Sequence, residues 1–133
     1  MTQRKVALIT GAGTGVGAAT ALMLAGKGYN ILVNYSRSAD EAEASAAACR
    51  AAGADALVMQ GDVAQDADCR ALAQAAVTRW GRIDALVNNA GISVFGKAAE
   101  WDELDAAAFQ RILGVNTIGA FQMVRACAPQ LKR

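Results

Sequence analysis

The chain has 133 residues, of which 54% are apolar and 19% are charged, and its formal net charge is +1. This composition is typical of one folded domain with its own core and not of a disordered chain. Because the charge is nearly balanced and forms no blocks, nucleic acid and anionic membranes are not expected partners. No apolar run reaches the roughly 18 residues that a membrane span needs.

The N-terminal segment and the cysteines argue against a secreted protein, a disulfide-rich protein and a metal-binding protein. The apolar run of residues 6–9 is too short for a signal-peptide core, and it ends in Thr10-Gly11 and not in a cleavage site. We therefore expect a cytoplasmic protein. The chain has no histidine, and its cysteines are widely spaced, at Cys49, Cys69 and Cys127. That number and spacing predict three reduced thiols, with neither a disulfide framework nor a metal site.

Apolar strands and alanine-rich helices alternate along the chain. The predicted strands are Val6–Thr10, Ile31–Tyr35, Ala56–Gln60 and Ile83–Asn88. The predicted helices are Val16–Gly28, Asp40–Ala52, Asp66–Trp80 and a longer one near Leu104–Leu131. Near-continuous apolarity favours a parallel sheet that is covered on both faces. The alternation predicts a doubly wound, Rossmann-like α/β fold, with residues 1–133 as the N-terminal part of a single domain that stops after the fourth strand and its helix.

Residues that favour helix ends lie at several of these boundaries. Asp40, with Glu43 three residues later, is expected to cap the second helix, and Asp66 the third. The first three helices are expected to end at glycines, namely Gly28, Gly53 and Gly81.

A glycine-rich turn joins the first strand to the first helix, with the sequence Thr10-Gly11-Ala12-Gly13-Thr14-Gly15-Val16-Gly17. Glycine lets a backbone approach phosphate closely, and a helix N-terminus offers free N–H groups and partial positive charge. At a first strand–helix junction, such a turn favours a dinucleotide site over a turn that only packs. No Gly-Lys-Ser/Thr follows, which excludes a P-loop. The candidate binding residues here are Gly11, Gly13, Thr14, Gly15, Val16 and Gly17.

Three further loops follow the carboxyl ends of predicted strands. They contain Tyr35-Ser36-Arg37, Asp62-Val63 and Asn88-Asn89-Ala90-Gly91. In open parallel sheets, ligands bind outside the carboxyl ends of the strands, where the strand order reverses. All four loops are therefore expected to meet at one edge. For Asp62 and the Asn88-Asn89 pair, an ordinary turn role remains open. The further candidate binding residues are Tyr35, Ser36, Arg37, Asp62, Val63, Asn89, Ala90 and Gly91.

The spacing Thr-Gly-x-x-x-Gly-x-Gly, at residues 10–17, resembles the short-chain dehydrogenase/reductase family and differs from the plain GxGxxG of other Rossmann enzymes. Asp62, the Asn-Asn-Ala-Gly at residues 88–91 and Asn116 match further motifs of that family in the same order. The resemblance covers the whole chain. It implies hydride transfer between a nicotinamide dinucleotide and a carbonyl or alcohol substrate. It also implies that Asp62 contacts adenine and that Asn116, at a break in a long helix, is catalytic through a water of the proton relay.

The end of the second strand bears on the choice of cofactor. Rossmann enzymes that prefer NAD place an acidic residue there, whereas this chain has Tyr35 followed by Ser36-Arg37-Ser38. Arginine and hydroxyl groups can receive a 2′-phosphate, so NADP(H) is favoured over NAD(H). Two points weigh against this preference. Thr14 is not a basic residue, and a lone arginine such as Arg37 is usually only a solvated surface charge.

The resemblance also implies catalytic groups that residues 1–133 lack: a serine and a Tyr-x-x-x-Lys pair. Tyr29 and Tyr35 are the only tyrosines, and neither has lysine four residues later. We therefore expect this chain as printed not to turn over substrate. The substrate itself stays open between a 3-oxoacyl thioester, a sugar and a small ketone. The segment 92–100 lies where the resembling family lines its substrate entrance.

Two other classes remain open on the residues alone. One is a non-catalytic nucleotide-binding protein that acts as a sensor or scaffold, and the other is a purely structural α/β module. A Tyr-x-x-x-Lys pair beyond residue 133 would select the oxidoreductase, and failure to bind either dinucleotide would select the module. We also expect a homodimer or homotetramer, because the fourth strand leaves an apolar edge and the resemblance implies that the last helix helps to form a dimer interface. That the large apolar residues of this helix simply cover the sheet remains open, and both roles are compatible if they use different faces. These residues are Phe109, Ile112, Leu113, Val115, Phe121 and Val124.

Overall fold

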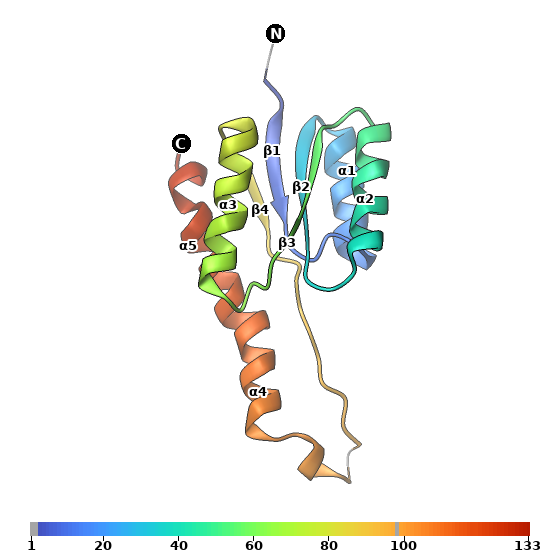
Figure 1. The fold of residues 1–133 in the computed structure, drawn as a ribbon, viewed down its shortest axis with the longest axis vertical. Coiled ribbons are helices and arrows are strands. Elements are labelled where there is room, and N and C mark those ends of the chain that lie inside the picture. The colour runs from blue at the N-terminus through green and yellow to red at the C-terminus, as the bar shows by residue number, and fades with distance from the viewer. Residues whose placement is uncertain (1–2, 98) are drawn as a thin grey trace.

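The computed structural model describes residues 3–97 and 99–133. Its core is a parallel sheet with the strand order β3-β2-β1-β4, formed by β1 (Lys5–Ile9), β2 (Tyr29–Tyr35), β3 (Ala56–Gln60) and β4 (Ala85–Val87). As Figure 1 shows, α1 (Gly15–Gly26) and α2 (Ala39–Ala51) cover one face, and α3 (Asp66–Trp80) and α5 (Ala120–Leu131) cover the other. The predicted doubly wound parallel sheet is confirmed.

Side-chain alternation along the central strand explains the two layers of core. Because successive residues of a strand point to opposite faces, Val6 and Leu8 pack on the side of α3 and α5. Ala7 and Ile9 pack on the side of α1 and α2. All of these side chains are completely buried. The chain therefore needs near-continuous apolarity in this strand, as its sequence has.

The order of the strands decides where a ligand can enter. The chain builds β1, β2 and β3 side by side in one direction and then places β4 on the opposite side of β1. The connections leaving β1 and β4 diverge, which opens a crevice at the carboxyl ends of these strands. The glycine turn and the loops after β2, β3 and β4 all lie at that end of the sheet.

Several element boundaries differ from the sequence prediction. The fourth strand covers only Ala85–Val87, because β4 pairs with β1 alone and its partners are residues 7–9. The first helix ends two residues before Gly28, which takes the left-handed φ of 100° that glycine tolerates. Gly53 and Gly81 likewise follow the second and third helices with left-handed φ angles, as predicted.

The predicted caps at Asp40 and Asp66 are wrong. The second helix begins at Ala39, and Asp40 lies inside its first turn. The third helix begins at Asp66 itself, whose carboxylate instead pairs with Arg70 and with Arg125, each at 2.8 Å. Both carboxylates still lie in the first turn of a helix, where the positive end of the helix dipole stabilises them. The two acids therefore indicated the helix starts correctly, although neither is the capping residue.

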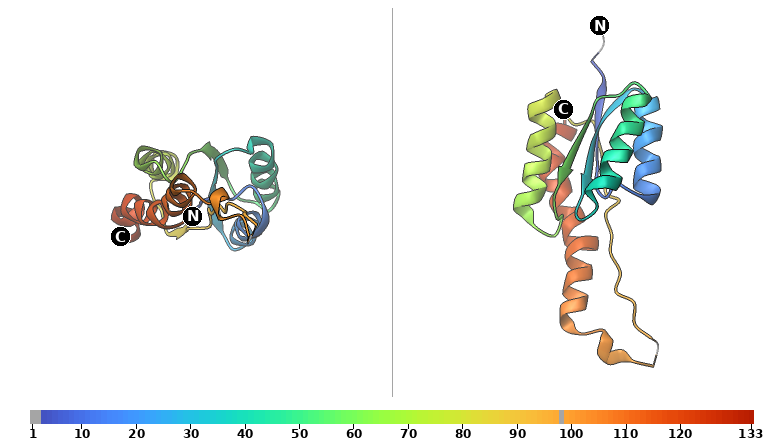
Figure 2. Two further views of the ribbon diagram at one scale, coloured as in Figure 1. Left: turned by 90° about the horizontal axis from the view of Figure 1, so that it is seen from below. Right: turned by 45° about the vertical axis from the view of Figure 1, so that its right-hand side comes forward.

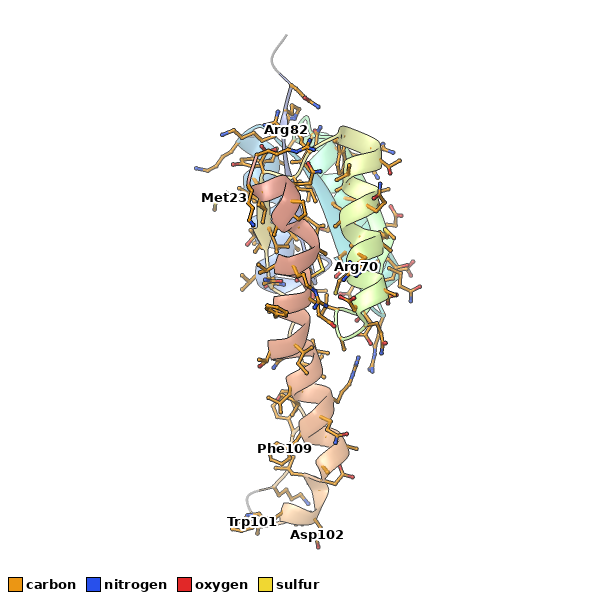
Figure 3. The ribbon with its side chains drawn as sticks, turned by 90° about the vertical axis from the view of Figure 1, so that its left-hand side faces the viewer. Met23, Arg70, Arg82, Trp101, Asp102 and Phe109 are labelled. Carbon is orange, nitrogen blue, oxygen red and sulfur yellow. The ribbon has the colours of Figure 1, made fainter. Side chains whose placement is uncertain are left out.

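The last helical stretch is interrupted and not one uniform helix. It consists of α4 (Ala106–Leu113), a π-helical turn (Gly114–Gly119) and α5, and a short 3-10 helix (Trp101–Glu103) precedes it. The Asp105 side chain caps α4 by accepting the N–H of Ala108 at 2.9 Å. Figure 2 shows α4 and its preceding segment extending as an arm beyond the strands. In Figure 3, Phe109 and Trp101 lie on this arm, far from Arg70 on the body.

Within the described ranges, no helix is both long and apolar enough to cross a bilayer. The three cysteines are buried free thiols. Burial raises the pKa of Cys69 and of Cys127 to about 11, so these thiols are protonated at neutral pH and are poor nucleophiles.

Candidate functional site

A cleft of about 360 Å³ opens at the carboxyl ends of the strands, where the four predicted loops meet. Most of the predicted binding residues line it: Gly11, Thr14, Gly15, Val16, Ser36, Asp62, Val63, Asn89, Ala90 and Gly91. Further lining residues were not singled out from the sequence: Asn34, Gly61, Ile92, Arg111 and Val115. Gly17 and Asn116 lie outside this lining. Gly17 packs against Gly11 and Asn89, and Asn116 hydrogen-bonds Ile92, all three of which are lining residues.

The glycine turn is shaped by two close constraints. Gly15 has a left-handed φ of 54°, and a Cβ built on it would meet no atom within 4 Å, so its backbone borders open space. Gly17 is buried in the next turn of the chain. A Cβ there would collide with the carbonyl oxygen of Gly11 and lie 2.5 Å from Asn89 Nδ2. The backbone at Gly15 therefore borders the cleft, whereas Gly17 packs tightly against the loop that carries Asn89.

The N-terminus of α1 faces the cleft without a side-chain cap. Thr14 holds the N-cap position in an extended conformation, and its hydroxyl makes no capping hydrogen bond. The first N–H groups of a helix have no partner within the helix, and they carry its positive dipole end. Thr14, Gly15 and Val16 all line the cleft. At this helix end, the backbone itself therefore supplies hydrogen-bond donors and positive potential to the cleft.

Thr10 and Asn89 fasten the loop after β4 to the glycine turn. The Thr10 hydroxyl oxygen accepts the N–H groups of Asn89 at 3.1 Å and Ala90 at 3.0 Å. In return, Asn89 Nδ2 donates to the Gly11 carbonyl at 2.9 Å. Part of the polarity of the Asn-Asn-Ala-Gly motif is thus used to hold the cleft together.

Asn34 supports the same turn from β2 and was missed by sequence reasoning. Its side chain is almost fully buried. Asn34 Oδ1 accepts the Gly11 N–H at 3.2 Å, and Nδ2 donates to the carbonyls of Gly61 at 3.2 Å and Met59 at 3.3 Å. The available signal was an amide in an otherwise apolar strand, because a buried amide needs polar partners.

Asp62 organises the loop after β3. Its N–H donates to Asp68 Oδ2 at 2.9 Å, and its own Oδ1 accepts the Ala64 N–H at 3.0 Å. The second carboxylate oxygen pairs with Arg111 Nη1 at 2.9 Å. Asp62 therefore fulfils the turn role that the sequence left open, and it also presents a carboxylate at the cleft.

Asn116 lies in the π-helical turn, so the break in the long helix is present. Asn116 Oδ1 accepts the Ile92 N–H at 2.8 Å, and Nδ2 donates to the Ile92 carbonyl at 2.9 Å. Both polar atoms of this side chain are thus used on the backbone of a cleft-lining residue. The geometry is that of a side chain that positions residues 91–92.

A smaller recess of about 170 Å³ adjoins the cleft beside the end of β2. It brings together the residues predicted to choose the cofactor, Tyr35, Ser36 and Arg37, with Gly13 and Thr14 of the glycine turn. Ser38, the second hydroxyl residue of this loop, also lines it, as does Glu41, which the sequence had not indicated. The recess therefore holds one cation, several hydroxyl groups and one carboxylate.

The model of the short chain dehydrogenase family matches residues 5–133. This chain belongs to the short-chain dehydrogenase/reductase family. It is 36% identical to a 3-oxoacyl-[acyl-carrier-protein] reductase of Staphylococcus aureus over 138 residues, which cover 100% of this chain and 53% of that protein. It is 41% identical to a protein of Streptomyces violaceoruber assigned as a ketoacyl reductase of granaticin polyketide synthase, over 96% of this chain and 50% of that one.

Solved structures agree with this assignment. A crystal structure assigned to the short-chain dehydrogenase/reductases, from Burkholderia xenovorans, matches with a TM-score of 0.93 and 40% identity, over 99% of this chain and 54% of that chain. A mutant short-chain dehydrogenase/reductase of Serratia marcescens matches with a TM-score of 0.89 and 36% identity. The chain spans about half the length of the curated relatives it matches.

In this short-chain dehydrogenase/reductase chain, Asn116→Ala is expected to release the backbone of Ile92. Each hydrogen bond contributes about 0.5–1.5 kcal/mol, so the Ile92 amide should exchange its hydrogen at least about fivefold faster. Hydrogen exchange followed by NMR measures this directly. Asn88→Ala is the matched control, because the Asn88 amide donates to the Ala120 carbonyl at the same sheet edge. Unchanged exchange at Ile92 in Asn116→Ala would contradict the positioning role.

Proposed function

We propose that residues 1–133 form the dinucleotide-binding half of an oxidoreductase, which transfers a hydride between NADP(H) and a carbonyl or alcohol substrate. The observation that carries this proposal is the cleft at the strand-order switch, where an uncapped helix N-terminus and three further loops share one space. In the whole protein, the bound dinucleotide would supply or accept the hydride.

Each loop has the chemistry for one part of a dinucleotide. The N–H groups of residues 14–16 suit the diphosphate, because they are uncapped and border the open space at Gly15. Residues 35–37 suit the adenosine ribose, and Asp62 with Val63 suits adenine. Residues 89–91, which Thr10 and Asn116 hold in place, suit the nicotinamide end. Asn116 would act through this positioning and through the relay water that the family resemblance implies.

We also propose that residues 1–133 bind the dinucleotide without turning over substrate. Tyr29 begins β2, at the end of the sheet opposite the cleft, whereas Tyr35 lines the recess. Neither precedes a lysine by four residues. Isothermal titration with NADPH is expected to show binding, and NADPH absorbance with a 3-oxoacyl thioester is expected to stay constant. Steady oxidation would contradict this proposal, and failure to bind NADPH or NADH would contradict the function itself.

For the whole protein, we favour a 3-oxoacyl thioester over a sugar or a small ketone. This preference is supported by two relatives that match nearly the whole of this chain. One is named a 3-oxoacyl-[acyl-carrier-protein] reductase and the other a ketoacyl reductase. Ile92, the first residue of the segment 92–100, lines the cleft, and Phe95 of the same segment is 92% exposed. Residue 98 of this segment lies outside the described residues.

Preference for NADP(H) rests on the recess beside β2. We expect Arg37→Gln to weaken NADPH binding at least about tenfold and to leave NADH binding unchanged, because a charge-assisted hydrogen bond contributes about 1.5–3 kcal/mol. Glu41→Gln should strengthen NADPH binding, since it removes a carboxylate from the recess that we propose for the 2′-phosphate. Titration calorimetry of both cofactors measures these ratios. Lys27→Gln, which removes a cation at the far end of α1, should change neither.

Self-association is proposed to use the outer face of α4 and α5. Phe109 and Leu113 of α4 and Phe121 and Val124 of α5 are exposed. Val115 is buried beside the cleft, so this residue covers the core and does not belong to the exposed face. Exposed clusters of large apolar side chains are typical of protein–protein interfaces. Light scattering at micromolar concentration is expected to show a dimer or tetramer, and a monomer would contradict this.

A further inference from the structure

Arg111 reaches the cleft from α4, an element that none of the four predicted loops includes. Its Nη1 donates to Asp62 Oδ2 at 2.9 Å, across 49 positions of sequence. Both side chains line the same cleft, and they are 39% and 30% exposed. The ion pair is therefore part of the cleft wall and remains open to a bound molecule.

The loop that carries Asp62 is held rigidly, so Arg111 has a fixed partner. Gln122 Nε2 donates to the Val63 carbonyl at 2.8 Å, and Cys69 Sγ donates to the same oxygen at 3.2 Å. Gly119 lies so close that a Cβ there would stand 2.9 Å from that oxygen. Contacts from α3, the π-helical turn and α5 therefore fix the position of this loop, and with it the position of the Asp62 carboxylate.

Asp62 and Arg111 can each form more hydrogen bonds than they make with the protein. A carboxylate can accept about four hydrogen bonds and a guanidinium can donate five. Among the described residues, Asp62 accepts from Ala64 and Arg111, and Arg111 donates only to Asp62. Exposed ion pairs contribute little to stability, so fold stability alone is a weak reason for this contact.

The chemistry of the pair favours a neutral planar base over an anion. Asp62 neutralises Arg111 at 2.9 Å, so a phosphate gains little there. Anion-binding groups lie elsewhere, at the N-terminus of α1 and at Arg37. A carboxylate accepts an amino group, and a guanidinium covers an aromatic face. Adenine offers both an amino group and an aromatic face.

We propose that Arg111 is a positioning residue for the adenine of the dinucleotide: its guanidinium covers the base and holds the amino group of the base against Asp62. This inference rests on the proposed function. It adds α4 to the dinucleotide site, so the arm and the body of the protein are joined through the bound base.

The test compares NADPH with its hypoxanthine analogue, which lacks the amino group, by titration calorimetry on residues 1–133. The wild-type chain is expected to prefer NADPH by about tenfold, since one hydrogen bond to a charged group is lost with the analogue. Arg111→Met should weaken NADPH binding and bring this preference close to one. Arg111→Lys keeps the charge but not the planar face, and it should also discriminate less than the wild type.

The control is Arg125→Met, which removes another ion pair between distant elements, with Asp66 at 2.8 Å, outside the cleft. It should retain the wild-type preference. Hydrogen exchange provides a second readout, because NADPH should slow exchange in α4 of the wild type and not of Arg111→Met.

A merely structural role would weaken both ligands equally and leave their ratio unchanged, which would overturn the proposal. A wild-type chain that binds NADPH without any preference over the analogue would also overturn it while leaving the proposed function intact. Binding of neither ligand by the wild type would overturn both.

Discussion

Gly17→Ala is expected to destabilise the chain by about 3 kcal/mol and to abolish measurable dinucleotide binding, because the added Cβ cannot be accommodated in a packed interior. It would collide with the Gly11 carbonyl, and it would lie 2.5 Å from Asn89 Nδ2 and 3.0 Å from Ala12 Cα. Two of these three atoms belong to the backbone of the glycine turn. The turn would therefore have to move, and Asn89 would lose its bond to Gly11.

Chemical denaturation gives the change in unfolding free energy, and calorimetric titration with NADPH gives the affinity. Gly26→Ala is the matched control in the same helix, because a Cβ there would meet no atom within 4 Å. It is expected to raise stability by up to about 1 kcal/mol through helix propensity and to leave binding unchanged. A Gly17→Ala chain as stable as the wild type would show that the turn is not packed as described.

Asn34→Leu is expected to cost about 4 kcal/mol, because leaving a buried polar group without a partner costs about 1–3 kcal/mol for each group. The amide of Asn34 serves the Gly11 N–H and the carbonyls of Met59 and Gly61. Leucine has the same branching and the same number of side-chain heavy atoms, but it forms none of these hydrogen bonds. Since whole domains are stable by only about 5–15 kcal/mol, the loss is a large part of the total.

The expected loss should appear as a lower midpoint in denaturant and as weaker NADPH binding, since the glycine turn and Gly61 both line the cleft. Asn30→Ala is the control on the same strand. Asn30 Oδ1 accepts the Asp55 N–H at 3.0 Å, at the end of β2 far from the cleft. That variant should lose about 1 kcal/mol and retain its affinity. Equal effects of the two substitutions on affinity would contradict the role given to Asn34.

These two predictions share one physical basis. Much of the polarity at the cleft is spent on protein contacts: Thr10, Asn34, Asn89 and Asn116 hydrogen-bond the backbone of neighbouring loops. What faces the cleft from the glycine turn is mainly uncapped backbone N–H. Such a site is assembled before a ligand arrives, and this reduces the conformational cost of binding.

The sequence by itself determined the alternation of strands and helices, the glycine turn and the meeting of four loops at one edge. These features follow from local rules: residue periodicity, glycine's conformational range and the common direction of parallel strands. The sequence also contained the family motifs, because these lie in single loops whose spacing is readable without a fold.

Only the tertiary structure decided which side chain meets which across the chain. Arg111 on α4 pairs with Asp62, and Asn116 in the π-helical turn holds Ile92, because the fold brings these distant segments together. Asp66 bridges to Arg125 in place of capping its helix, because α5 packs beside α3. Such contacts depend on the distance and angle between packed elements, and no spacing along the sequence encodes either quantity.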